Sequence, residues 1–508
     1  MARVPGGVMS RVRTGLLCLS FAILIAVGLA GPSAAKPPLG PRGWAPGTLD
    51  WQLSPTSVSV LLYIAFIAGG IGVILALIRP AERTWGWALP LALGVLALLT
   101  GPFGSADHVN YAAYGRIAAQ GGDPYLESPI GWHGGLDPVT ASVQPPWQHT
   151  PSIYGPFATM LQAISSFIGG QNLRVTVWIW QVFIVLAWLG CRWVLLQLAP
   201  DRRRRIDLLW TFNPVVFGTL VLGAHVDLIA GFFVVAALLA ARRSPWLAGA
   251  LTGAAFSTKV TYGVVGVALA WAWWQVDRRK IGARGTWVLP GRLWSLLGGA
   301  LLVVVPCYLV AGPHVLHQLG AAGGSFSYAS PWSLPIRLLR VLGLPEWLVT
   351  TVVFVLAAAA MVLFALALWA VIRRYGLADR IRDPLTRHAV VATFVLSTAF
   401  AVLAPYTLPW YDATTWLLLP LLAAFVWDAL FVVRAVVMAL AYAPGRATGL
   451  DQSTANWTLG FRENVAPYLG WLIVAAFGWL GWRSAAHVRR GVGDVLQPEL
   501  GEDRPRVR

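Results

Sequence analysis

One carboxylate, Asp107, stands near the start of a long polar stretch in an otherwise apolar chain. Residues 85–102 are apolar enough to cross a bilayer, and the polar stretch 103–152 follows them. In a chain of net charge +17, this stretch holds one base and four acids: Arg116, Asp107, Asp123, Glu127 and Asp137. A carboxylate fixed at a membrane surface can take the proton from a sugar hydroxyl as that hydroxyl attacks. Asp107 is therefore the candidate general base, although its position also suits a solvated loop residue or an N-cap for a helix over 109–119.

Aromatic side chains accompany this carboxylate, and aromatic rings stack on the C–H faces of sugars. Tyr111 and Tyr114 lie three residues apart and share one face of the expected helix. We expect sugar or acceptor contacts from these two and others: Tyr111, Tyr114, Asp123, Tyr154, Asp227, Trp410 and Tyr411. The competing interpretations are an interfacial belt for the Trp and Tyr residues and a simple turn for Asp123-Pro124.

Three basic side chains near the expected outer surface are candidates for contact with a phosphate. Lys259 ends the apolar segment 246–258, and Arg337 lies between two apolar segments. His225 and Asp227 lie close to a membrane edge, where ionisable groups are costly and suggest a functional site. We expect Lys259, His225 and Arg337 to face a phosphate, and Asp227 to orient His225 or bind sugar hydroxyls. Snorkelling to lipid headgroups is the alternative for Lys259 and Arg337.

The chain lacks motifs that bind nucleotides or catalytic metals in many soluble enzymes. It contains no Gly-Lys-Ser/Thr phosphate loop and no His-Glu-x-x-His helix. A sugar donor used outside the cytoplasm would therefore be carried on a lipid rather than on a nucleotide. The acidic stretch is compatible with a divalent metal, but no ligand spacing indicates one, so we expect no required cofactor. Cys18, Cys191 and Cys307 lie in apolar segments and do not suggest a disulfide framework.

Composition places the chain in a lipid bilayer. Hydrophobic residues make up 57% of it, charged residues 12%, and the mean hydropathy is +0.65. Helices satisfy their own backbone hydrogen bonds in lipid, so we predict an all-α polytopic membrane protein. Basic residues cluster between apolar segments, at 202–205, 242–243, 278–280 and 373–374. This positive-inside pattern places those loops in the cytoplasm and argues against a nucleic-acid-binding surface.

Apolar runs predict about 13–14 transmembrane helices, if a first helix within 1–35 is included. The other expected spans are 56–79, 85–102, 174–197, 206–222, 226–241, 246–258, 260–276, 292–312, 346–371, 388–404, 412–427, 428–443 and 466–485. Residues 153–169 are also apolar, but a crossing there would move the basic cluster 202–205 to the outside. We expect this segment to be a helix lying at the outer interface.

The expected organisation follows from these spans. It comprises a signal-like segment or first transmembrane helix at 1–35, N-terminal helices at 36–102, an extracytoplasmic loop with interfacial helices at 103–173, a central bundle at 174–312, an extracytoplasmic loop at 313–345, C-terminal helices at 346–485 and a disordered cytoplasmic tail at 486–508. The basic N-terminus, its apolar run and Ser33-Ala34-Ala35 suit either a cleaved signal peptide or a retained helix.

Several short motifs resemble, in order and spacing, those of the polyprenol-phosphomannose-dependent α-1,6-mannosyltransferases, within the GT-C superfamily of membrane glycosyltransferases. The motifs are Asp107 after a span, Tyr111-Ala-Ala-Tyr114-Gly115, Gly122-Asp123-Pro124-Tyr125, Tyr154-Gly155-Pro156, Asn213-Pro214, His225-Val226-Asp227 and Leu408-Pro409-Trp410-Tyr411. The resemblance runs from residue 85 to residue 430, and the segment 428–465 departs from it.

The resemblance implies a GT-C fold, in which a large first extracytoplasmic loop carries interfacial helices and the catalytic Asp. By this correspondence Asp107 is the general base of an inverting, multi-pass plasma-membrane mannosyltransferase whose active site faces outwards. The donor would be polyprenyl-phosphate-mannose. The acceptor would be a mannan or phosphatidylinositol-mannoside-type glycan, within the α-1,6-mannan core of a lipoglycan such as lipomannan.

Two other interpretations stay open. One is a related transferase of the same fold that acts in arabinosyl transfer or protein O-mannosylation. The other is a transporter or flippase for a polyprenyl-linked sugar. A transporter is expected to carry paired charges near the middle of the membrane and broken helices in both halves, whereas the candidate charges here collect on one face.

Overall fold

The computed structural model describes residues 6–47, 49–79, 85–284, 289–322, 325–446 and 448–495. Throughout this part of the chain the regular structure is helical and no strand forms, which confirms the all-α fold class. The helices of twelve residues or more are α1 (Gly6–Leu29), α2 (Pro55–Ile78), α3 (Ala88–Leu99), α4 (Asp107–Ala119), α5 (Pro156–Gly169), α6 (Leu173–Leu198), α9 (Asp227–Ala240), α10 (Pro245–Thr258), α11 (Val264–Arg284), α12 (Leu289–Ala311), α15 (Glu346–Arg374), α16 (Pro384–Leu403), α18 (Trp427–Tyr442), α19 (Gln452–Asn464) and α20 (Ala466–Val495). Shorter helices include α7 (Arg203–Ile206), α8 (Pro214–Val216), α13 (His314–Ala322), α14 (Ser333–Val341) and α17 (Ala413–Leu418).

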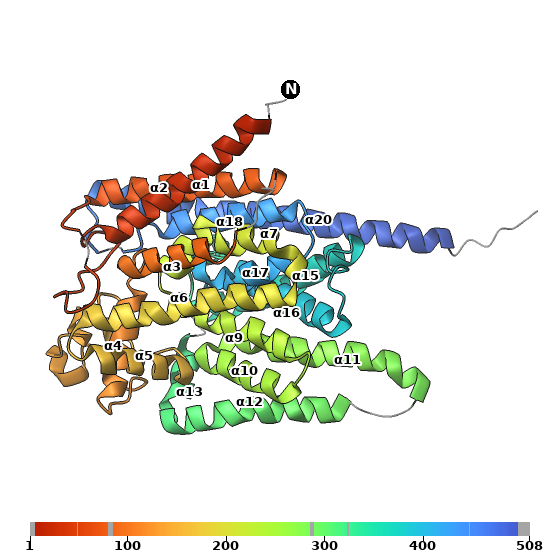
Figure 1. Ribbon diagram of the computed structural model, residues 1–508, viewed down its shortest axis with the longest axis horizontal. Coiled ribbons are helices and arrows are strands. Elements are labelled where there is room, and N and C mark those ends of the chain that lie inside the picture. The colour runs from red at the N-terminus through yellow and green to blue at the C-terminus, as the bar shows by residue number, and fades with distance from the viewer. Residues whose placement is uncertain are drawn as a thin grey trace, which may run out of the picture.

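The long helices lie side by side with their axes along one direction (Figure 1). Among the described residues, seven helices are long and apolar enough to cross a bilayer: Val8–Leu29, Pro55–Ile78, Leu173–Leu198, Gly291–Ala311, Glu346–Arg374, Pro384–Leu403 and Gln452–Ser484. A polytopic membrane protein is therefore confirmed, with fewer full-length spans than the about 13–14 expected from apolar runs. The difference arises because α9, α10 and α18 have only 14, 14 and 16 residues. At about 1.5 Å per residue they are shorter than the hydrocarbon core is thick.

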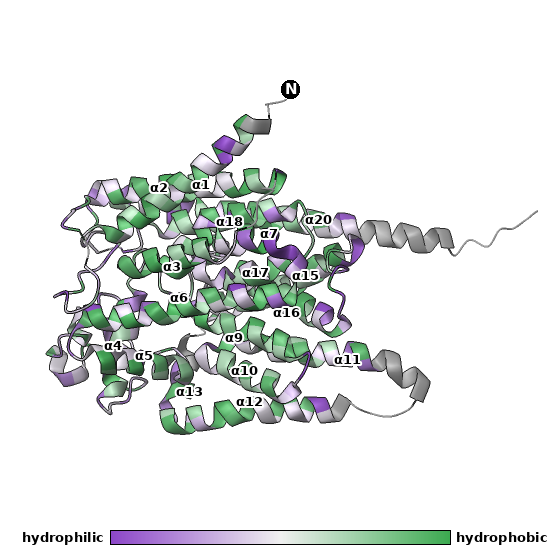
Figure 2. Cartoon of the chain, viewed as in Figure 1, coloured by the Kyte–Doolittle hydropathy of each residue, from purple (hydrophilic) through white to green (hydrophobic). Residues whose placement is uncertain are grey.

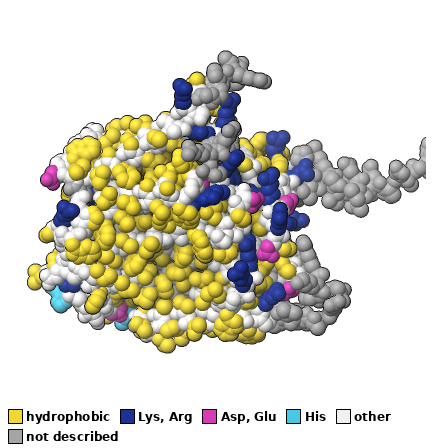
Figure 3. Space-filling view, viewed as in Figure 1, with side chains coloured by type: hydrophobic (Ala, Val, Ile, Leu, Met, Phe, Trp, Pro, Cys, Tyr) yellow, Lys and Arg dark blue, Asp and Glu magenta, His cyan; other side chains and the backbone are white. Residues whose placement is uncertain are grey.

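Hydropathy and charge vary along the axis of the bundle. Hydrophobic residues dominate its helices and form a broad apolar face (Figures 2 and 3). On this face most Lys and Arg side chains gather towards the end away from α4 and α5, on the right in Figure 3. Cytoplasmic loops of membrane proteins are enriched in Lys and Arg, so α4 and α5 lie at the end expected to face outwards.

Several bundle helices begin at side-chain caps that the sequence displays. Ser54, Asn172 and Asp383 precede α2, α6 and α16, and the side chain of each accepts a hydrogen bond from an amide of the first turn. The helices therefore start close to the predicted spans 56–79 and 174–197. Apolar runs located these helices, and the capping residues lie immediately before them.

Two predicted spans are interrupted. The segment predicted as a span at 206–222 is bent by 47° at Asn213-Pro214, because Pro214 has no amide hydrogen with which to continue the preceding helix. The segment predicted at 412–427 is not a single helix. There α17 passes into a 3-10 turn that ends at Leu421, and residues 422–426 are not helical. The turn contains Pro420, which again removes a donor.

The C-terminal tail begins later than expected. Helix α20 continues to Val495. The prediction of a disordered tail from residue 486 is therefore corrected for residues 486–495. Residues 496–508 lie outside the described part of the chain. The first proline after the start of the predicted tail is Pro498, so nothing in 486–495 forbids a helix. Residues 80–84, between the predicted spans 56–79 and 85–102, also lie outside the described residues.

Helix α5 matches the segment expected not to cross the membrane. Its 14 residues span about 21 Å, too short for a bilayer core. It packs between α4, α6 and α10 and exposes one apolar face. The exposed residues are Met160, Ile164, Phe167 and Ile168. This pattern is typical of a helix at the membrane interface.

Helices α4 and α5 cross at a glycine. A Cβ atom placed on Gly115 would lie 2.2 Å from the carbonyl oxygen of Gln162 in α5. We expect Gly115→Ala to force the helices apart and lower the free energy of unfolding by about 2 kcal/mol or more. Denaturant titration of the purified protein would measure this. Gly460→Ala in α19 is the control, because the space around Gly460 is open and alanine favours a helix. Equal stability of the two variants would contradict the close crossing.

Candidate active site

Asp107 is the first residue of α4 and faces an open cavity of about 580 Å³. The cavity walls come from α4, the segment 147–154, the end of α10 at Lys259 and the segment 406–411. The side chain of Asp107 is 17% exposed, so the carboxylate is shielded but accessible. A helix N-terminus favours a negative charge, which suits an ionised carboxylate at this position.

The cavity collects six of the residues proposed from the sequence. They are Asp107, Tyr114, Tyr154, Lys259, Trp410 and Tyr411. Asn110 and Tyr406 also line it and were missed. The signal for Asn110 was present, because Asp107, Asn110 and Tyr114 follow the i, i+3, i+7 spacing of one helical face. In the described structure the Asn110 Oδ1 atom is buried without a hydrogen-bond partner. This oxygen can therefore accept a hydrogen bond from a hydroxyl group of a ligand.

A buried histidine lies directly behind Asp107. The Nδ1 atom of His225 is 3.4 Å from Oδ2 of Asp107, and its Nε2 atom is 3.5 Å from the hydroxyl oxygen of Ser105. The imidazole also stacks on Trp410, with ring centroids 3.5 Å apart and planes 13° apart. The sequence predicted that His225 would face a phosphate. The structure instead groups it with the candidate base.

Lys259 lies at the end of α10 in an ion pair. Its Nζ atom is 2.7 Å from Oδ1 of Asp227, which also accepts a hydrogen bond of 2.9 Å from the Tyr262 hydroxyl. Nζ lies 3.8 Å from the ring centroid of Tyr411, a cation–π contact. Asp227 therefore orients Lys259 rather than His225. Tyr262 follows Lys259 by three residues, and that spacing was its only sequence signal.

A second cavity of about 510 Å³ adjoins this ion pair. Asp227, Tyr262 and Tyr411 line it together with apolar side chains of α11 and α16, including Leu396 and Phe400. Leu396 is 38% exposed on the surface of the bundle. The ion pair therefore lies between the cavity that contains Asp107 and a second cavity whose lining includes apolar side chains of α11 and α16.

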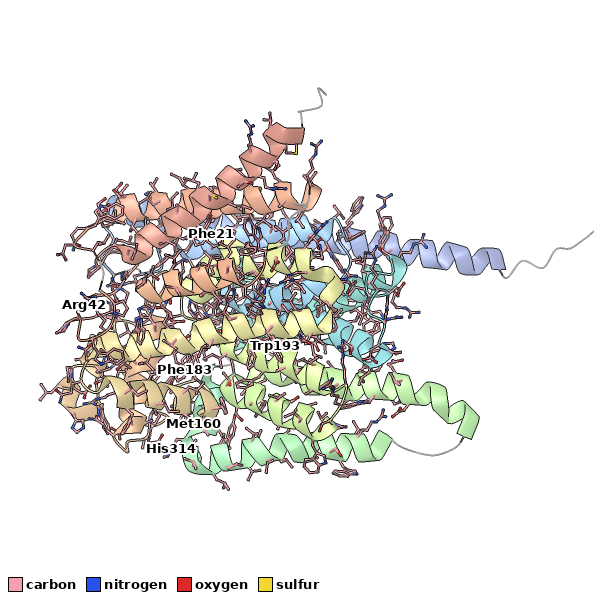
Figure 4. The ribbon with its side chains drawn as sticks, viewed as in Figure 1. Phe21, Arg42, Met160, Phe183, Trp193 and His314 are labelled. Atoms are coloured by element: carbon pink, nitrogen blue, oxygen red, sulfur yellow. The ribbon has the colours of Figure 1, made fainter. Side chains whose placement is uncertain are left out.

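Three predicted site residues lie elsewhere. Arg337 in α14 is partly buried and donates a hydrogen bond of 3.1 Å to the Asn464 side chain. Asp123 pairs with His314 at 2.7 Å and lines a separate groove between α5 and α12. Figure 4 places His314 and Met160, another residue of that groove, at the same end of the molecule. Tyr111 is buried beneath the pocket and packs edge-on against Tyr154, at 5.0 Å between ring centroids.

The acidic stretch is not an acidic pocket. The guanidinium of Arg116 lies 2.9 Å from Asp137 and also donates to the carbonyl of Gly170 after α5. Burial would raise the pKa of Asp137, but hydrogen bonds from Arg116 and from the amides of Val139 and Thr140 lower it overall. Asp137 therefore has a structural role, because it joins Arg116 of α4 to the backbone of residues 139 and 140. Of the four acids in this stretch, only Asp107 lines the catalytic cavity.

His108, the neighbour of Asp107, is fully buried. Within the described structure neither of its ring nitrogens has a hydrogen-bond partner. Burial, followed by the proximity of His225, Lys36 and Arg446, lowers its pKa to about 3. His108 is therefore held neutral and does not face the cavity.

The buried His108 predicts acid sensitivity. Its folded pKa lies below the unfolded value near 6.5, so stability is full above that value and falls as the pH drops towards 3. The contribution lost at pH 5 is about 2 kcal/mol. We expect His108→Leu to remove this part of the pH dependence. Denaturant titrations at pH 7.5 and pH 5 would measure it, and an undiminished pH dependence in the variant would contradict the assignment.

No cation site is apparent in the cavity. Among the described residues, no group of three or more His, Cys, Asp or Glu side chains comes close enough to hold a metal ion. The positive charge available to a ligand there is the ammonium of Lys259. The chemistry that the arrangement supports is proton removal by a carboxylate beside a binding site for an anionic group.

Comparison with known families agrees with this chemistry. A family model described as alpha-(1->6)-mannopyranosyltransferase, N-terminal domain, matches residues 16–275, and the model of glycosyltransferase family 87 matches residues 153–405. Together the two matches span every segment that lines the cavity except 406–411. No curated protein and no solved structure matches the chain.

Proposed function

The chain belongs to the α-(1→6)-mannopyranosyltransferase family of membrane glycosyltransferases, and from this we propose its donor and acceptor. It transfers mannose from polyprenyl-phosphate-mannose to the α-1,6-mannan core of a cell-envelope lipoglycan, of the mannan or phosphatidylinositol-mannoside type. The observation that carries the proposal is one cavity lined by both the Asp107 carboxylate and the Lys259 ammonium. The first can accept a proton and the second can stabilise a phosphate.

The proposed reaction is a single displacement. The acceptor hydroxyl oxygen attacks the anomeric carbon of mannose, and the bond from that carbon to the phosphate oxygen breaks. The hydroxyl proton passes to Asp107, and the bonding electrons leave with the polyprenyl phosphate. The anomeric configuration therefore inverts, from the β-linked donor to an α-linked product. No enzyme nucleophile is required, because the phosphate is already a good leaving group.

Lys259 is proposed to stabilise the departing phosphate. An ammonium carries three donors, and only one of them is engaged by Asp227. The remaining donors are available to phosphate oxygens as negative charge develops on them. Removing one such electrostatic contact from an active site typically costs about 10²–10³-fold in rate. Tyr411 beneath the ammonium and Tyr262 on Asp227 hold this charge pair in place.

The adjoining cavity is compatible with a lipid-linked donor. It lies beside the Lys259–Asp227 pair, and its apolar lining residues are Val264 of α11 and Leu396 and Phe400 of α16. A polyprenyl chain in this cavity would bring its phosphate to Lys259 and its mannose towards Asp107. A nucleotide sugar has no chain to fill such a space.

The catalytic cavity is proposed to open on the extracytoplasmic face. It lies at the end of the bundle that carries α4 and α5, and most Lys and Arg side chains on the viewed face gather towards the other end (Figures 1 and 3). The positive-inside rule then orients the bundle in a plasma membrane with this end outwards.

Reconstitution tests the proposal. Purified protein in lipid nanodiscs would receive polyprenyl-phosphate-mannose, the arabinose analogue or the glucose analogue, each with a short α-1,6-mannoside acceptor. The expected product is an acceptor extended by one α-1,6-linked mannose, formed only from the mannose donor. Transfer from another donor, or another linkage, would contradict the proposed specificity. Movement of the donor across vesicle membranes without any product would favour a flippase.

A further inference from the structure

His225 is buried, with 1% of its surface exposed, and does not line the catalytic cavity. Its backbone is held firmly. The preceding residue, Ala224, has a positive φ of 54°, which is rare for a residue with a side chain. The indole of Trp180 donates a hydrogen bond of 2.8 Å to the Ala224 carbonyl, and the His225 amide donates to Leu220. A backbone held in a sparsely populated conformation is a feature often found beside active sites.

The polar groups around this histidine lie close to Asp107. The Asp107 amide donates to the Ser105 hydroxyl oxygen at 3.3 Å, and that hydroxyl lies 3.5 Å from His225 Nε2. His225 Nδ1 lies 3.4 Å from Asp107 Oδ2, but in the described structure this buried nitrogen makes no hydrogen bond. An ionised carboxylate only accepts hydrogen bonds, so an Nδ1–H is the group that can pair with Asp107 when the contact shortens. Nε2 is then left to accept a hydrogen bond from the Ser105 hydroxyl.

We propose that His225 is a positioning residue for the reaction, and this inference rests on the proposed role of Asp107 as general base. Its Nδ1–H holds Oδ2 of Asp107, so that Oδ1 is presented to the acceptor hydroxyl. The stacked indole of Trp410 fixes the plane of the imidazole, and Trp410 also lines the cavity. The same indole thereby couples the sugar-binding wall to the orientation of the base. Such contacts are often long without substrate and shorten in the reactive complex.

Two substitutions separate positioning from packing. His225→Phe keeps a flat ring against Trp410 but has no N–H, whereas His225→Asn places an amide N–H near the position of Nδ1. We expect His225→Phe to lower kcat by about 10²-fold, with the donor KM within about 2-fold of wild type. We expect His225→Asn to recover kcat to within about 10-fold of wild type. Assays in nanodiscs with polyprenyl-phosphate-mannose would measure both constants.

A matched control removes the neighbouring histidine. His108→Leu deletes the same residue type one position from Asp107, yet His108 has no hydrogen bond to the base and does not line the cavity. Its kcat at pH 7.5 is expected to equal that of the wild type. If His225→Phe does not fold, Ser105→Ala provides the second test. It should lower kcat more in the wild type than in His225→Asn, because asparagine has no atom at the Nε2 position, whereas the Ser105 contact with the Asp107 amide is lost in both backgrounds.

Three results would overturn the inference. They are wild-type kcat in His225→Phe, equal losses in His225→Phe and His225→Asn, and an additive effect of Ser105→Ala in the His225→Asn background. The failure of this inference is distinguishable from failure of the proposed function. If Asp107→Asn is inactive while His225→Phe is fully active, only the positioning role of His225 is contradicted. If Asp107→Asn is active, the assignment of Asp107 as the general base is contradicted.

Discussion

Replacing Asp107 with asparagine is expected to lower kcat for mannosyl transfer by about 10³-fold, within the usual range for loss of a general base. The amide has almost the same shape but cannot take the acceptor proton. The donor phosphate lies against Lys259 in the proposed complex, so donor affinity should stay within about 2-fold of wild type. Product formation from radiolabelled donor and equilibrium binding of a non-transferable donor analogue would measure the two quantities.

Glu127→Gln is the matched control for this variant. It makes the same carboxylate-to-amide change in the same stretch, 103–152, but Glu127 does not line the cavity. Its kcat is expected to equal that of the wild type. If the Asp107 and Glu127 variants were equally active, Asp107 would not be the base. If both lost donor binding, the effect would come from the charge of the stretch as a whole.

Replacing Lys259 with methionine is expected to lower kcat/KM for the donor by about 10²–10³-fold. Methionine keeps the length of the side chain but offers no charge to the departing phosphate. Because the ammonium contacts the phosphate in the ground state as well, the donor KM should rise, unlike in the Asp107 variant. Steady-state assays with varied polyprenyl-phosphate-mannose would separate the two constants.

The Lys259 variant also leaves Asp227 without its ion-pair partner, and the Asp227 side chain is only 1% exposed. Breaking a buried ion pair typically costs about 3–5 kcal/mol, so the loss of activity needs a stability control. The double variant Lys259→Met with Asp227→Asn should regain most of the thermal stability and none of the activity. Recovery of activity in the double variant would show that Lys259 stabilises the folded protein and does not bind the phosphate.

Much of the fold was predictable because the lipid environment restricts the backbone. The apolar runs 56–79 and 174–197 predicted α2 and α6 closely, since a helix must satisfy its backbone hydrogen bonds within the membrane. The break within 206–222 was less predictable, although Asn213-Pro214 marks it. Whether a proline bends a helix or merely begins one depends on what packs against the freed carbonyls, which the local sequence does not show.

The cavity residues were partly predictable from their types and their places relative to the spans. Asp107, Lys259 and Trp410 are far apart in the sequence but were each expected at the outer end of the bundle, where the structure brings them together. The i, i+3, i+7 spacing of Asp107, Asn110 and Tyr114 also predicts that Asn110 lines the cavity. A helix beginning at Asp107 places all three on one face.

The partners of the charged residues were not predictable. His225 and Asp227 are two residues apart, yet the first contacts Asp107 and the second contacts Lys259. Residue 227 begins α9 while residue 225 lies before it, so their side chains point to different neighbours. Counting acids in 103–152 was misleading for a similar reason, because the structure neutralises Asp137 with Arg116. Such pairings depend on tertiary packing that no local pattern encodes.

The most direct test of the account asks which side of the membrane the Asp107 end of the bundle faces. Leu136 in the stretch 103–152 is 86% exposed, and Arg243 lies in the loop after α9, at the opposite end of that helix from Asp227. Leu136→Cys and Arg243→Cys would each be made in a Cys18→Ala background, since Cys18 is exposed. Intact cells would then be treated with a membrane-impermeant maleimide. The account predicts labelling at position 136 and none at position 243 until the cells are opened. Labelling at 243 with protection at 136 would contradict it, because a sugar carried on an outward-facing lipid could not reach Asp107.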